Sequence, residues 1–345
     1  MKACVIHGAG DLRLEDRSVP QLGDRDVMVR VRAGGICGSD LHYYAHGGIG
    51  DFIIREPLTP GHEFSGEVAE IGAAVTAVQP GDRVAVHPGR SCGRCRPCRE
   101  GRPNLCQAVF FMGSASKFPH MQGAFCEFVA VDQSQCHKVS AGLDFPIAAF
   151  AEPLSVVLHA AHRAGNLMGQ HVLITGSGPI GQLMLLVAKR GGAVDVTVTD
   201  IQDATLTNAA KIGADRTVNT ATEKGALEQI AKDFDGFDVA FEVSGAPSAL
   251  NDAIMAVHPG AIIVQVGSPP GGPQPILANR VMAKELDIRG TFRFGNVFAD
   301  AVACLDRRLI DVSPILTAVV PMTKARDAFA MAGDRAHHLK VAIEF

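Results

Sequence analysis

Short segments of alternating or β-branched hydrophobic residues dominate roughly the first 145 residues of the chain. Glycine, proline and aspartate separate these segments, as is typical of strands joined by turns. The segments are MKACVIH (1–7), DVMVRVR (26–32), HEFSGEVAEIG (62–72), DRVAVHP (82–88) and GAFCEFVAVD (123–132). The pattern predicts an antiparallel, barrel-like β domain, and it leaves the order of the strands open.

The pattern changes near Phe150, where predicted strands and amphipathic helices begin to alternate. SVVLHAAHRAG (155–165) has helical spacing and ends on a glycine. The segments that follow are a strand at QHVLITG (170–176), a helix at GPIGQLMLLVAKRGG (178–192), and strands at VDVTVTD (194–200), KIGADRTVN (211–219), FDVAFEVSG (237–245), AIIVQVGS (261–268) and LDIRGTF (286–292). This alternation predicts βαβ units and a parallel sheet. The tail, HLKVAIEF (338–345), is strand-like again.

Composition is that of an ordinary globular chain with room for two domains. The chain has 345 residues, of which 47% are hydrophobic and 20% charged, and its formal net charge is −4. These values offer no basic surface for nucleic acid. The chain contains no run of about 18 apolar residues that would predict a membrane span, and its start, MKACVIHGAG, lacks the apolar region of a secretory signal. We therefore expect a cytoplasmic protein that binds neither nucleic acid nor membranes.

Residues 172–181, VLITGSGPIG, carry the glycine pattern of a dinucleotide-binding turn. The first glycine, Gly176, permits a tight turn, Gly178 lets the backbone approach a pyrophosphate, and Gly181 allows close packing of helix and strand. The N-terminus of the following helix offers unpaired N–H groups to the phosphates. Since the same pattern also fits a simple glycine-rich turn, its context decides between the two interpretations.

That context includes an acidic residue at the end of the next predicted strand. Asp200 closes VTVTD, about 24 residues after the first glycine. A carboxylate at this place accepts hydrogen bonds from ribose hydroxyls and repels a 2′-phosphate. The following residues, IQDATL, include no arginine or lysine. We therefore expect NAD as the cofactor, in preference to NADP.

Four of the nine cysteines lie in CGRCRPCREGRPNLC (92–106), with the spacing C-x2-C-x2-C-x7-C. Such a group supplies the four thiolates of a closed, tetrahedral zinc site. The four cysteines are Cys92, Cys95, Cys98 and Cys106. An iron–sulfur cluster and a lobe without metal are the alternatives. We expect a structural zinc that takes no part in the chemistry.

A second set of metal-ligating residue types is dispersed along the chain. Cys37 lies in GICGSDLHYY, His62 and Glu63 follow a glycine in PGHEF, and Glu152 lies in AFAEP. Thiolate, imidazole and carboxylate all bind zinc, and a catalytic zinc site keeps one position open. Each residue also has a structural interpretation. In that interpretation Cys37 is a buried core residue, His62 and Glu63 belong to a turn, and Glu152 lies in the first turn of a helix beside Pro153.

In this order, GHEFSGEVAEIG, the cysteine segment and GSGPIG resemble the zinc-containing medium-chain dehydrogenases over essentially the whole chain. The resemblance implies a mixed α/β fold of two domains. A GroES-like, β-rich catalytic domain is expected at residues 1–148 and 288–345. A central Rossmann domain with a doubly wound parallel sheet is expected at residues 149–287. Within the family, the glutamate in AEP resembles the polyol dehydrogenase branch, typified by sorbitol dehydrogenase.

The resemblance assigns the dispersed residues to a catalytic zinc. It implies that Cys37, His62 and Glu63 are ligands, and that Glu152 binds the metal directly or holds its water. Since branch members differ in which glutamate touches the metal, Cys37 and His62 are the ligands expected first.

The resemblance also implies roles for the polar residues after Cys37. Ser39 is expected to hydrogen-bond the substrate hydroxyl, Asp40 to orient His62, and His42 to pass a proton to solvent. Tyr43 is expected to line the substrate pocket. Together these groups would support loss of a hydride from an alcohol whose pKa the zinc lowers. A turn role for Asp40 and a surface role for His42 are the alternatives.

GGICGSDLHYY, FFMGSASKFPHMQGAF and GTFRF are most similar to the branch members that oxidise L-idonate at C5. A sugar acid needs a cationic or donor-rich partner for its carboxylate, and the candidates are Lys117, His120 and Arg293. The residues expected to contact the cofactor are Gly176, Gly178, Pro179, Ile180, Gly181, Asp200, Val266, Gly267, Phe292 and Arg293.

Three alternatives to this function stay open. The substrate could be sorbitol, xylitol or a threonine-like secondary alcohol. The chain could be a cofactor-sensing binding protein that kept the fold, although its intact set of ligand residues argues against that. A zinc-independent quinone reductase is the third alternative, but such proteins lack the cysteine lobe. A catalytic member is expected to hold about two zinc ions per chain and to form a dimer or a tetramer.

Overall fold

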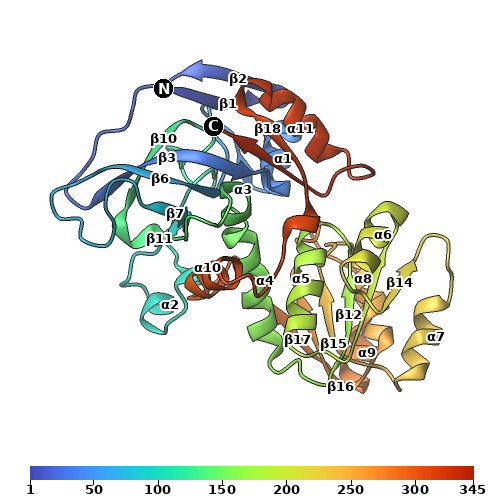
Figure 1. Ribbon diagram of the computed structural model, residues 1–345. Helices are drawn as coiled ribbons and strands as arrows, with labels where there is room; N and C mark the ends of the chain where they lie inside the picture. The colour runs from blue at the N-terminus through green and yellow to red at the C-terminus, as the bar shows by residue number, and fades with distance from the viewer. The chain divides into compact units, whose positions relative to one another are not determined.

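The computed structural model describes all residues from Met1 to Phe345, which form two compact units. The first unit comprises Met1–Pro153, Gly295–Asp334 and Lys340–Phe345. The second unit comprises Leu154–Phe294 and Arg335–Leu339. Both ends of the chain therefore belong to the first unit (Figure 1).

The unit boundaries differ by a few residues from those expected from the sequence. The first boundary follows Pro153, within helix α4 (Ala151–Ala164), and not residue 148. The second follows Phe294, and not residue 287. The second difference has a direct cause, because strand β17 (Asp287–Gly290) pairs with β16 in the sheet of the second unit.

A seven-stranded sheet forms the centre of the first unit. Its order is β11-β7-β6-β3-β19-β18, and β10 pairs with β3 off this path. All pairs are antiparallel except β18 with β19, which is parallel. The strands are β3 Asp26–Gly35, β6 Glu63–Ile71, β7 Arg83–Val86, β10 Phe128–Asp132, β11 Cys136–Lys138, β18 Leu316–Pro321 and β19 Lys340–Glu344. Because β19 lies beside β3, the last residues of the chain complete a sheet that begins near its start (Figure 1).

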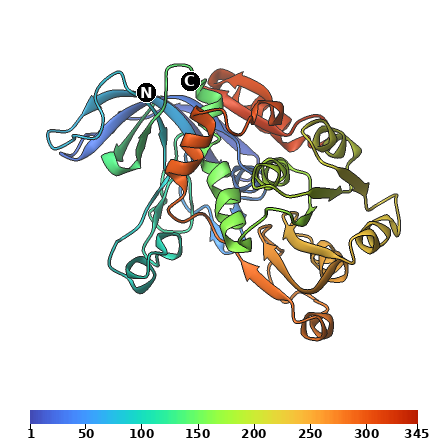
Figure 2. The same cartoon turned by 60° about the horizontal axis from the view of Figure 1, so that its bottom comes forward.

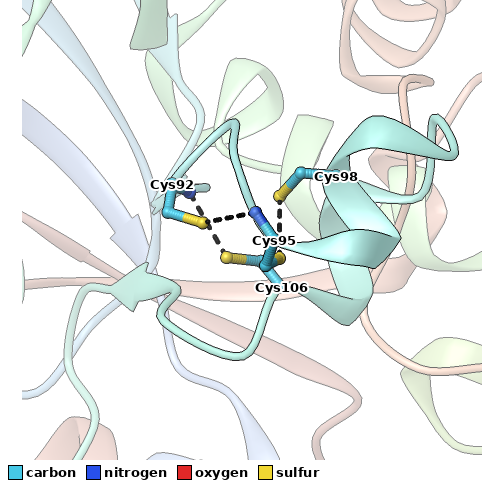
Figure 3. A group of neighbouring side chains, drawn as sticks. All are labelled: Cys92, Cys95, Cys98 and Cys106. Atoms are coloured by element: carbon cyan, nitrogen blue, oxygen red, sulfur yellow. Dashed lines mark hydrogen bonds between the residues drawn. The ribbon is translucent and has the colours of Figure 1, made fainter.

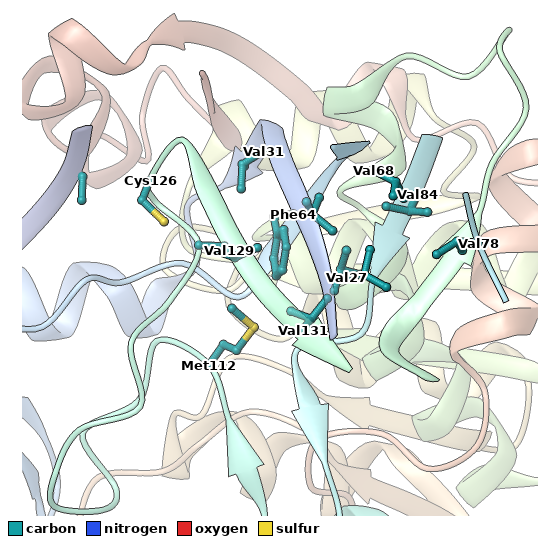
Figure 4. Close-up of a cluster of buried hydrophobic side chains, with 14 of the residues drawn as sticks. Val27, Val31, Phe64, Val68, Val78, Val84, Met112, Cys126, Val129 and Val131 are labelled. Carbon is teal, nitrogen blue, oxygen red and sulfur yellow. The ribbon is translucent and has the colours of Figure 1, made fainter. Parts of the chain in front are cut away.

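Valine at every second position of β3 places this strand in a hydrophobic core. Val27, Val29 and Val31 are each at most 1% exposed, as the two-residue period of a strand with one buried face requires. They belong to the same cluster as Phe64 and Val84 from the neighbouring strands (Figure 4). Full burial of a side chain of this kind contributes about 1.5–3 kcal/mol. The cluster therefore fixes the start of β6, where two candidate metal ligands lie.

Short elements complete the first unit. They are β1 Lys2–Gly8, β2 Asp11–Asp16, α1 Gly38–His46, β4 Gly48–Ile49, β5 Phe52–Ile53, β8 Gly89–Arg90, α2 Arg96–Arg99, β9 Phe110–Phe111, α3 Phe145–Ala148, α10 Phe298–Asp306, α11 Ala325–Gly333 and the 3-10 turns Pro103–Leu105, Gln133–Gln135, Ser313–Ile315 and Met322–Lys324. The segment that carries α2 projects away from the strands as a separate lobe in both views (Figures 1 and 2).

A six-stranded parallel sheet forms the second unit, with helices on both of its faces (Figure 2). The strand order is β14-β13-β12-β15-β16-β17. The elements are β12 His171–Thr175, α5 Pro179–Arg190, β13 Asp195–Asp200, α6 Asp203–Lys211, β14 Arg216–Asn219, α7 Ala226–Asp233, β15 Phe237–Glu242, α8 Pro247–Ala256, β16 Val257–Gln265, α9 Ala278–Ala283 and β17 Asp287–Gly290. The order reverses beside β12, and ligands of such sheets bind at the carboxyl edge of this reversal.

The structure confirms the predicted parallel sheet, but the predicted strand at residues 123–132 begins only at Phe128. The N–H groups of Ala124 and Phe125 instead donate to the carbonyl oxygens of Gly61 and Pro60, at 2.9 and 3.0 Å. This segment thus supports the loop that carries His62. None of the helices has the length and the apolar character needed to cross a membrane.

Candidate active site

Three residues with metal-ligating side chains come together in the first unit, as the sequence predicted. The potential ligand atoms of Cys37, His62 and Glu63 all lie within 4.8 Å of one another. Cys37 immediately precedes α1, His62 immediately precedes β6, and Glu63 is the first residue of β6. His62 and Glu63 are buried, and Cys37 is partly exposed. Solvent therefore reaches the cluster on the side of Cys37 only to a limited extent, and its other two members are enclosed.

Asp40 holds the backbone of this cluster and lies in ion-pair range of His62, the residue that it is predicted to orient. Its Oδ2 accepts a hydrogen bond from Cys37 N at 2.9 Å, and its Oδ1 accepts one from Gly61 N at 3.2 Å. The distance from Asp40 Oδ1 to His62 Nδ1 is 3.8 Å, which is too long for a hydrogen bond. The carboxylate, in the first turn of α1, reaches back to the backbone before the helix, and its role in orienting His62 stays a prediction. Asp40 nevertheless fixes the relative positions of Cys37 and the His62 loop.

A buried lysine, which the sequence analysis missed, contacts the same cluster. Lys340 Nζ lies in ion-pair contact with Glu63 Oε2 and donates a hydrogen bond to Ile36 O at 3.0 Å. Gly35 makes room for this pair, since a Cβ there would lie 2.3 Å from Glu63 Oε2 and 3.0 Å from Lys340 Cε. The only sequence signal was a lysine within the apolar tail strand HLKVAIEF.

The ionisable side chains of this cluster shift one another's pKa values. Desolvation works to lower the pKa of His62, but Cys37 and Asp40 outweigh it and raise that pKa well above its usual value. Desolvation raises the pKa of Glu152 to about 7, although His62 acts to lower it. Glu152 therefore lies close enough to His62 to interact with it electrostatically, but it stands outside the group of three ligand atoms. A carboxylate beside the ligands, and not among them, fits the second role predicted for Glu152.

The donor set fits a zinc ion. His62 Nδ1 is buried and has no hydrogen-bond partner of suitable geometry, whereas Glu63 Oε2 already contacts Lys340 Nζ. Buried polar atoms are normally hydrogen-bonded, so the unpaired nitrogen of His62 suits a site that binds a cation. One thiolate, one imidazole and one carboxylate, with a further position open, form the ligand set of a catalytic zinc. Cys37, His62 and Glu63 would hold the ion.

The four-cysteine group forms a second donor set in the lobe. The sulfur atoms of Cys92, Cys95, Cys98 and Cys106 lie within 4.8 Å of one another (Figure 3). All four sulfurs point into one centre, and that of Cys95 is 3.4 Å from that of Cys98 (Figure 3).

Backbone N–H groups favour the thiolate form of part of this group. Those of Arg94 and Cys95 lower the pKa of Cys92 to about 6. Desolvation and the neighbouring thiol of Cys95 raise the pKa of Cys98 to about 11. A cation would stabilise all four thiolates together, and four sulfur donors without an open position fit a closed, structural zinc.

Two residues predicted to contact substrate are instead part of the packed structure. Tyr43 is 3% exposed, and its hydroxyl accepts a hydrogen bond from Ala115 N at 3.0 Å. His120 is 6% exposed, and both of its ring nitrogens are engaged: Nε2 accepts from Arg55 N at 2.8 Å, and Nδ1 lies 2.7 Å from Lys117 O. The His120 ring has no nitrogen left for a substrate, and Tyr43 is enclosed in a hydrophobic core cluster, so both predictions are corrected.

The roles of the other residues expected to contact substrate or to transfer a proton stay predictions, and the structure shows only where these residues lie. Ser39 is partly exposed in the first turn of α1, and His42 is exposed one turn further on. Lys117 is partly exposed. Arg293 belongs to the second unit, where it has a φ of 52° and lies over the ring of Phe292 at 4.6 Å.

The glycine turn of the second unit has the shape that a dinucleotide needs. A Cβ on Gly181 would lie 1.9 Å from Gly176 O, so helix α5 packs directly against the turn. The helix begins at Pro179 with unpaired N–H groups in its first turn. Asp200 closes β13 beside this turn, and its Oδ2 accepts from Ser177 N at 2.6 Å. The turn, the helix N-terminus and the acid thus meet at one edge of the sheet, so these residues fit an NAD(P) molecule.

Comparisons with known proteins agree with both sites. Residues 23–141 match the family model of the alcohol dehydrogenase GroES-like domain, and residues 179–307 match that of the zinc-binding dehydrogenases. Sorbitol dehydrogenase of Gallus gallus is 38% identical over 334 residues, which cover 95% of this chain and 92% of that protein. L-idonate 5-dehydrogenase (NAD(P)(+)) of Escherichia coli K12 is 37% identical, and the match covers 100% of this chain and 98% of that protein.

Solved structures extend the agreement to the whole fold. The crystal structure of the E. coli L-idonate 5-dehydrogenase superposes with a TM-score of 0.94 at 36% identity, over 100% of this chain and 98% of that one. A short chain alcohol dehydrogenase from E. coli CFT073, complexed with NADH, superposes with a TM-score of 0.90 at 29% identity, over 100% of this chain and 99% of that one. The chain therefore belongs to the zinc-containing medium-chain alcohol dehydrogenase family, in the branch that includes the sorbitol and L-idonate dehydrogenases.

Proposed function

We propose that this protein is an NAD-linked dehydrogenase that oxidises the C5 hydroxyl of L-idonate to a ketone, giving 5-keto-D-gluconate and NADH. The observation that carries the catalytic part of the proposal is the convergence of Cys37, His62 and Glu63 within 4.8 Å. A zinc ion bound there would lower the pKa of an alcohol by several units, so that the hydroxyl can lose its proton near neutral pH. A bound NAD would supply the hydride acceptor.

Ser39 and His42 provide the route for the proton in this proposal. They are three residues apart in α1 and therefore lie on the same face of the helix. Ser39 is the partly exposed member, and the exposed His42 is in reach of water. Ser39 would take the proton of the substrate hydroxyl, and His42 would pass it to solvent. A positioned proton-transfer path of this kind contributes about 10²–10⁴-fold to the rate.

Two observations support a sugar acid as the substrate. The E. coli L-idonate dehydrogenase aligns with this chain over its full length. Lys117 and Arg293 also remain as cationic candidates for a carboxylate, now that His120 is excluded. We assign the carboxylate to one of these two residues. If Lys117→Ala and Arg293→Ala both keep the wild-type KM for L-idonate, the carboxylate assignment fails.

The alternative substrate is sorbitol or a related polyol. The similarity of vertebrate sorbitol dehydrogenases to this chain supports a polyol substrate. The chicken protein is 38% identical to the chain, which is as similar as the L-idonate enzyme. A polyol has no carboxylate and would need neither Lys117 nor Arg293.

The deciding experiment follows NADH formation at about 340 nm with L-idonate, sorbitol, xylitol and threonine, with and without a zinc chelator. We expect the highest kcat/KM with L-idonate, and loss of that activity with the chelator. A kcat/KM for sorbitol far above that for L-idonate would replace the first proposal by the second. Zinc analysis tests the non-catalytic alternative, since a catalytic chain is expected to hold about two ions. Light scattering tests the expected dimer or tetramer.

A further inference from the structure

A fully buried carboxylate, Glu242, lies at the carboxyl end of β15, where neither the glycine motif nor the catalytic cluster accounts for it. Its side chain is 0% exposed. Burial of an ionised carboxylate is costly unless hydrogen bonds replace its lost water. The groups that provide these hydrogen bonds therefore show what the carboxylate holds in place.

Neutral donors from the ends of two neighbouring strands, β12 and β16, and from the loop after β15 surround this carboxylate. Oε1 accepts from Ser244 N at 2.8 Å, from Gly245 N at 3.0 Å, from the Ser244 hydroxyl, and from the Thr175 hydroxyl at 3.4 Å. Oε2 accepts from the side-chain amide of Gln265. Every one of these contacts is a donor, which suits the ionised, acceptor-only form of a carboxyl group.

The sheet register explains why one side chain can reach all three segments. Thr175, Glu242 and Gln265 are the last residues of β12, β15 and β16. Thr175 is the cross-strand partner of Glu242, and Glu242 is the partner of Gln265. The three side chains therefore form one row across adjacent strands, at the edge where the strands end.

Backbone hydrogen bonds and close approaches lock the same segments to one another. Glu242 O accepts from Val266 N at 2.7 Å and from Gly267 N at 2.8 Å. The Gln265 amide donates to Gly267 O at 2.8 Å. A Cβ on Gly267 would lie 2.2 Å from Gly245 N, so the loops after β15 and β16 touch backbone to backbone. A shift of one loop would therefore shift the others.

We propose that Glu242 is a positioning residue for the dinucleotide, because its carboxylate fixes the loops after β12, β15 and β16 at the carboxyl edge of the sheet. The glycine turn begins at Gly176, directly after Thr175, and Val266 and Gly267 follow Gln265. Ligands of open parallel sheets bind at this edge, and a preorganised site loses less free energy on binding than one that must be ordered. The inference rests on the proposed NAD-linked function, but it does not depend on the alcohol that is oxidised.

The test replaces the carboxylate by its isosteric amide, Glu242→Gln, and titrates NADH by fluorescence. In the variant, the NH2 group of the amide replaces one carboxylate oxygen and faces groups that are themselves donors. At least one of these donors therefore loses its hydrogen-bond acceptor. We expect the Kd for NADH and the KM for NAD to rise about tenfold or more. The kcat at saturating NAD should stay within about threefold, because the zinc ligands belong to the other unit.

Asp238→Asn is the matched control, because Asp238 lies at the opposite end of the same strand. Its carboxylate accepts from His171 N on β12 at 2.7 Å and lies 3.2 Å from His258 Nε2 on β16. It thus bridges the same three strands at the edge remote from the loops. We expect this variant to lower the thermal midpoint of unfolding and to keep the wild-type Kd for NADH.

A second variant keeps the proposal testable if Glu242→Gln does not fold. Gln265→Leu removes the donor to Glu242 and to Gly267, and we expect it to weaken NADH binding severalfold. A wild-type Kd in soluble Glu242→Gln, or in Gln265→Leu when the first variant is insoluble, would overturn the positioning role. Equal loss of NADH affinity in Asp238→Asn would overturn it as well. Failure of the wild-type protein to bind NADH would instead overturn the proposed function.

Discussion

Lys340 and Glu63 form a buried ion pair that joins the last strand of the chain to the candidate metal cluster. Their side chains are 5% and 2% exposed. Desolvation works to lower the pKa of Lys340, but Glu63 and Cys37 outweigh it, so the net effect is a raised pKa and a charged ammonium group. The lysine balances the charge of the Glu63 carboxylate inside the first unit. The C-terminal strand is therefore part of the site, as well as of the sheet.

Lys340→Met is expected to destabilise the metal-free protein. The variant leaves Glu63 buried without its cationic partner, and removal of one partner of a buried pair costs about 3–5 kcal/mol. The measurement is urea unfolding of chelator-treated protein, compared with Lys340→Arg, which keeps the charge. Free energies of unfolding within about 1 kcal/mol of each other for Lys340→Met and the wild type would show that the pair contributes little.

Cys37→Ser is expected to remove one of the two zinc ions and the dehydrogenase activity together. The variant replaces the thiolate ligand by a weaker hydroxyl, while the four-cysteine lobe keeps its own donors. We expect about one zinc per chain and a fall in kcat/KM of about a thousandfold or more. The Kd for NADH should remain that of the wild type, since the glycine turn belongs to the other unit. Retention of both zinc ions would contradict the assignment of Cys37 as a ligand.

Patterns within short stretches of the sequence were enough to predict most of the fold. The alternation of strands and helices after Phe150 gave the parallel sheet, because each strand there is a short apolar run closed by turn residues. The cysteine spacing predicted the lobe for the same reason, since all four ligands lie within 15 residues, from Cys92 to Cys106.

Contacts between residues far apart in the sequence could not be predicted in this way. Lys340 reaches Glu63 only because β19 pairs with β3, and this pairing leaves no local pattern in the sequence. Tyr43 was interpreted as a pocket residue because it follows Cys37 so closely, yet its position in α1 turns it into the core. The sequence suggested that Asp40 lies near His62, but it gave no sign that the same carboxylate also accepts from the backbone N–H of Cys37.

Loss of zinc from the four-cysteine lobe is expected to affect the structure of the lobe and not the dehydrogenase reaction. Cys98→Ser removes one of four donors in a segment with little other secondary structure, α2 being only four residues long. We expect about one zinc per chain, and faster cleavage by trypsin after Arg94 and Arg99. Cofactor affinity should stay unchanged. If trypsin cleaves wild type and variant at the same rate, the metal does not order the lobe.

Asp200 is expected to control the choice between NAD and NADP, but through two effects at once. Its Oδ2 accepts from Ser177 N at 2.6 Å and its Oδ1 from Gln202 N at 3.0 Å, so it also braces the glycine turn. Asp200→Ala should therefore raise the KM for both cofactors. Addition of Ile201→Arg, at a position that is 63% exposed, should then raise NADP-linked kcat/KM above that of Asp200→Ala alone.

The role of Asp200 in cofactor choice is tested by the ratio of kcat/KM for NAD to kcat/KM for NADP, measured for each protein. We expect NAD to be favoured in the wild type and NADP in the double variant. Equal use of both cofactors by the wild type would contradict the selective role of Asp200.

His87 is expected to make the first unit less stable as the pH falls below about 6.5. The ring packs against Phe298, with 5.1 Å between ring centroids, and its Nδ1 accepts from Gly89 N at 2.9 Å. Desolvation, helped by the nearby His137, lowers the pKa of His87 to about 4. Between pH 6.5 and 4 the unfolded chain therefore binds a proton that the folded chain does not.

The free energy of unfolding should consequently decrease with falling pH by up to about 1.4 kcal/mol per pH unit from this residue, or about 3 kcal/mol in all. His87→Asn keeps an acceptor for the N–H of Gly89 but cannot take up the proton. Urea unfolding at several pH values should give a flatter dependence for the variant than for the wild type over this window, with the two curves converging in slope above pH 6.5. Parallel curves throughout would mean that another group, such as a metal ligand released on acidification, controls the acid sensitivity of the unit.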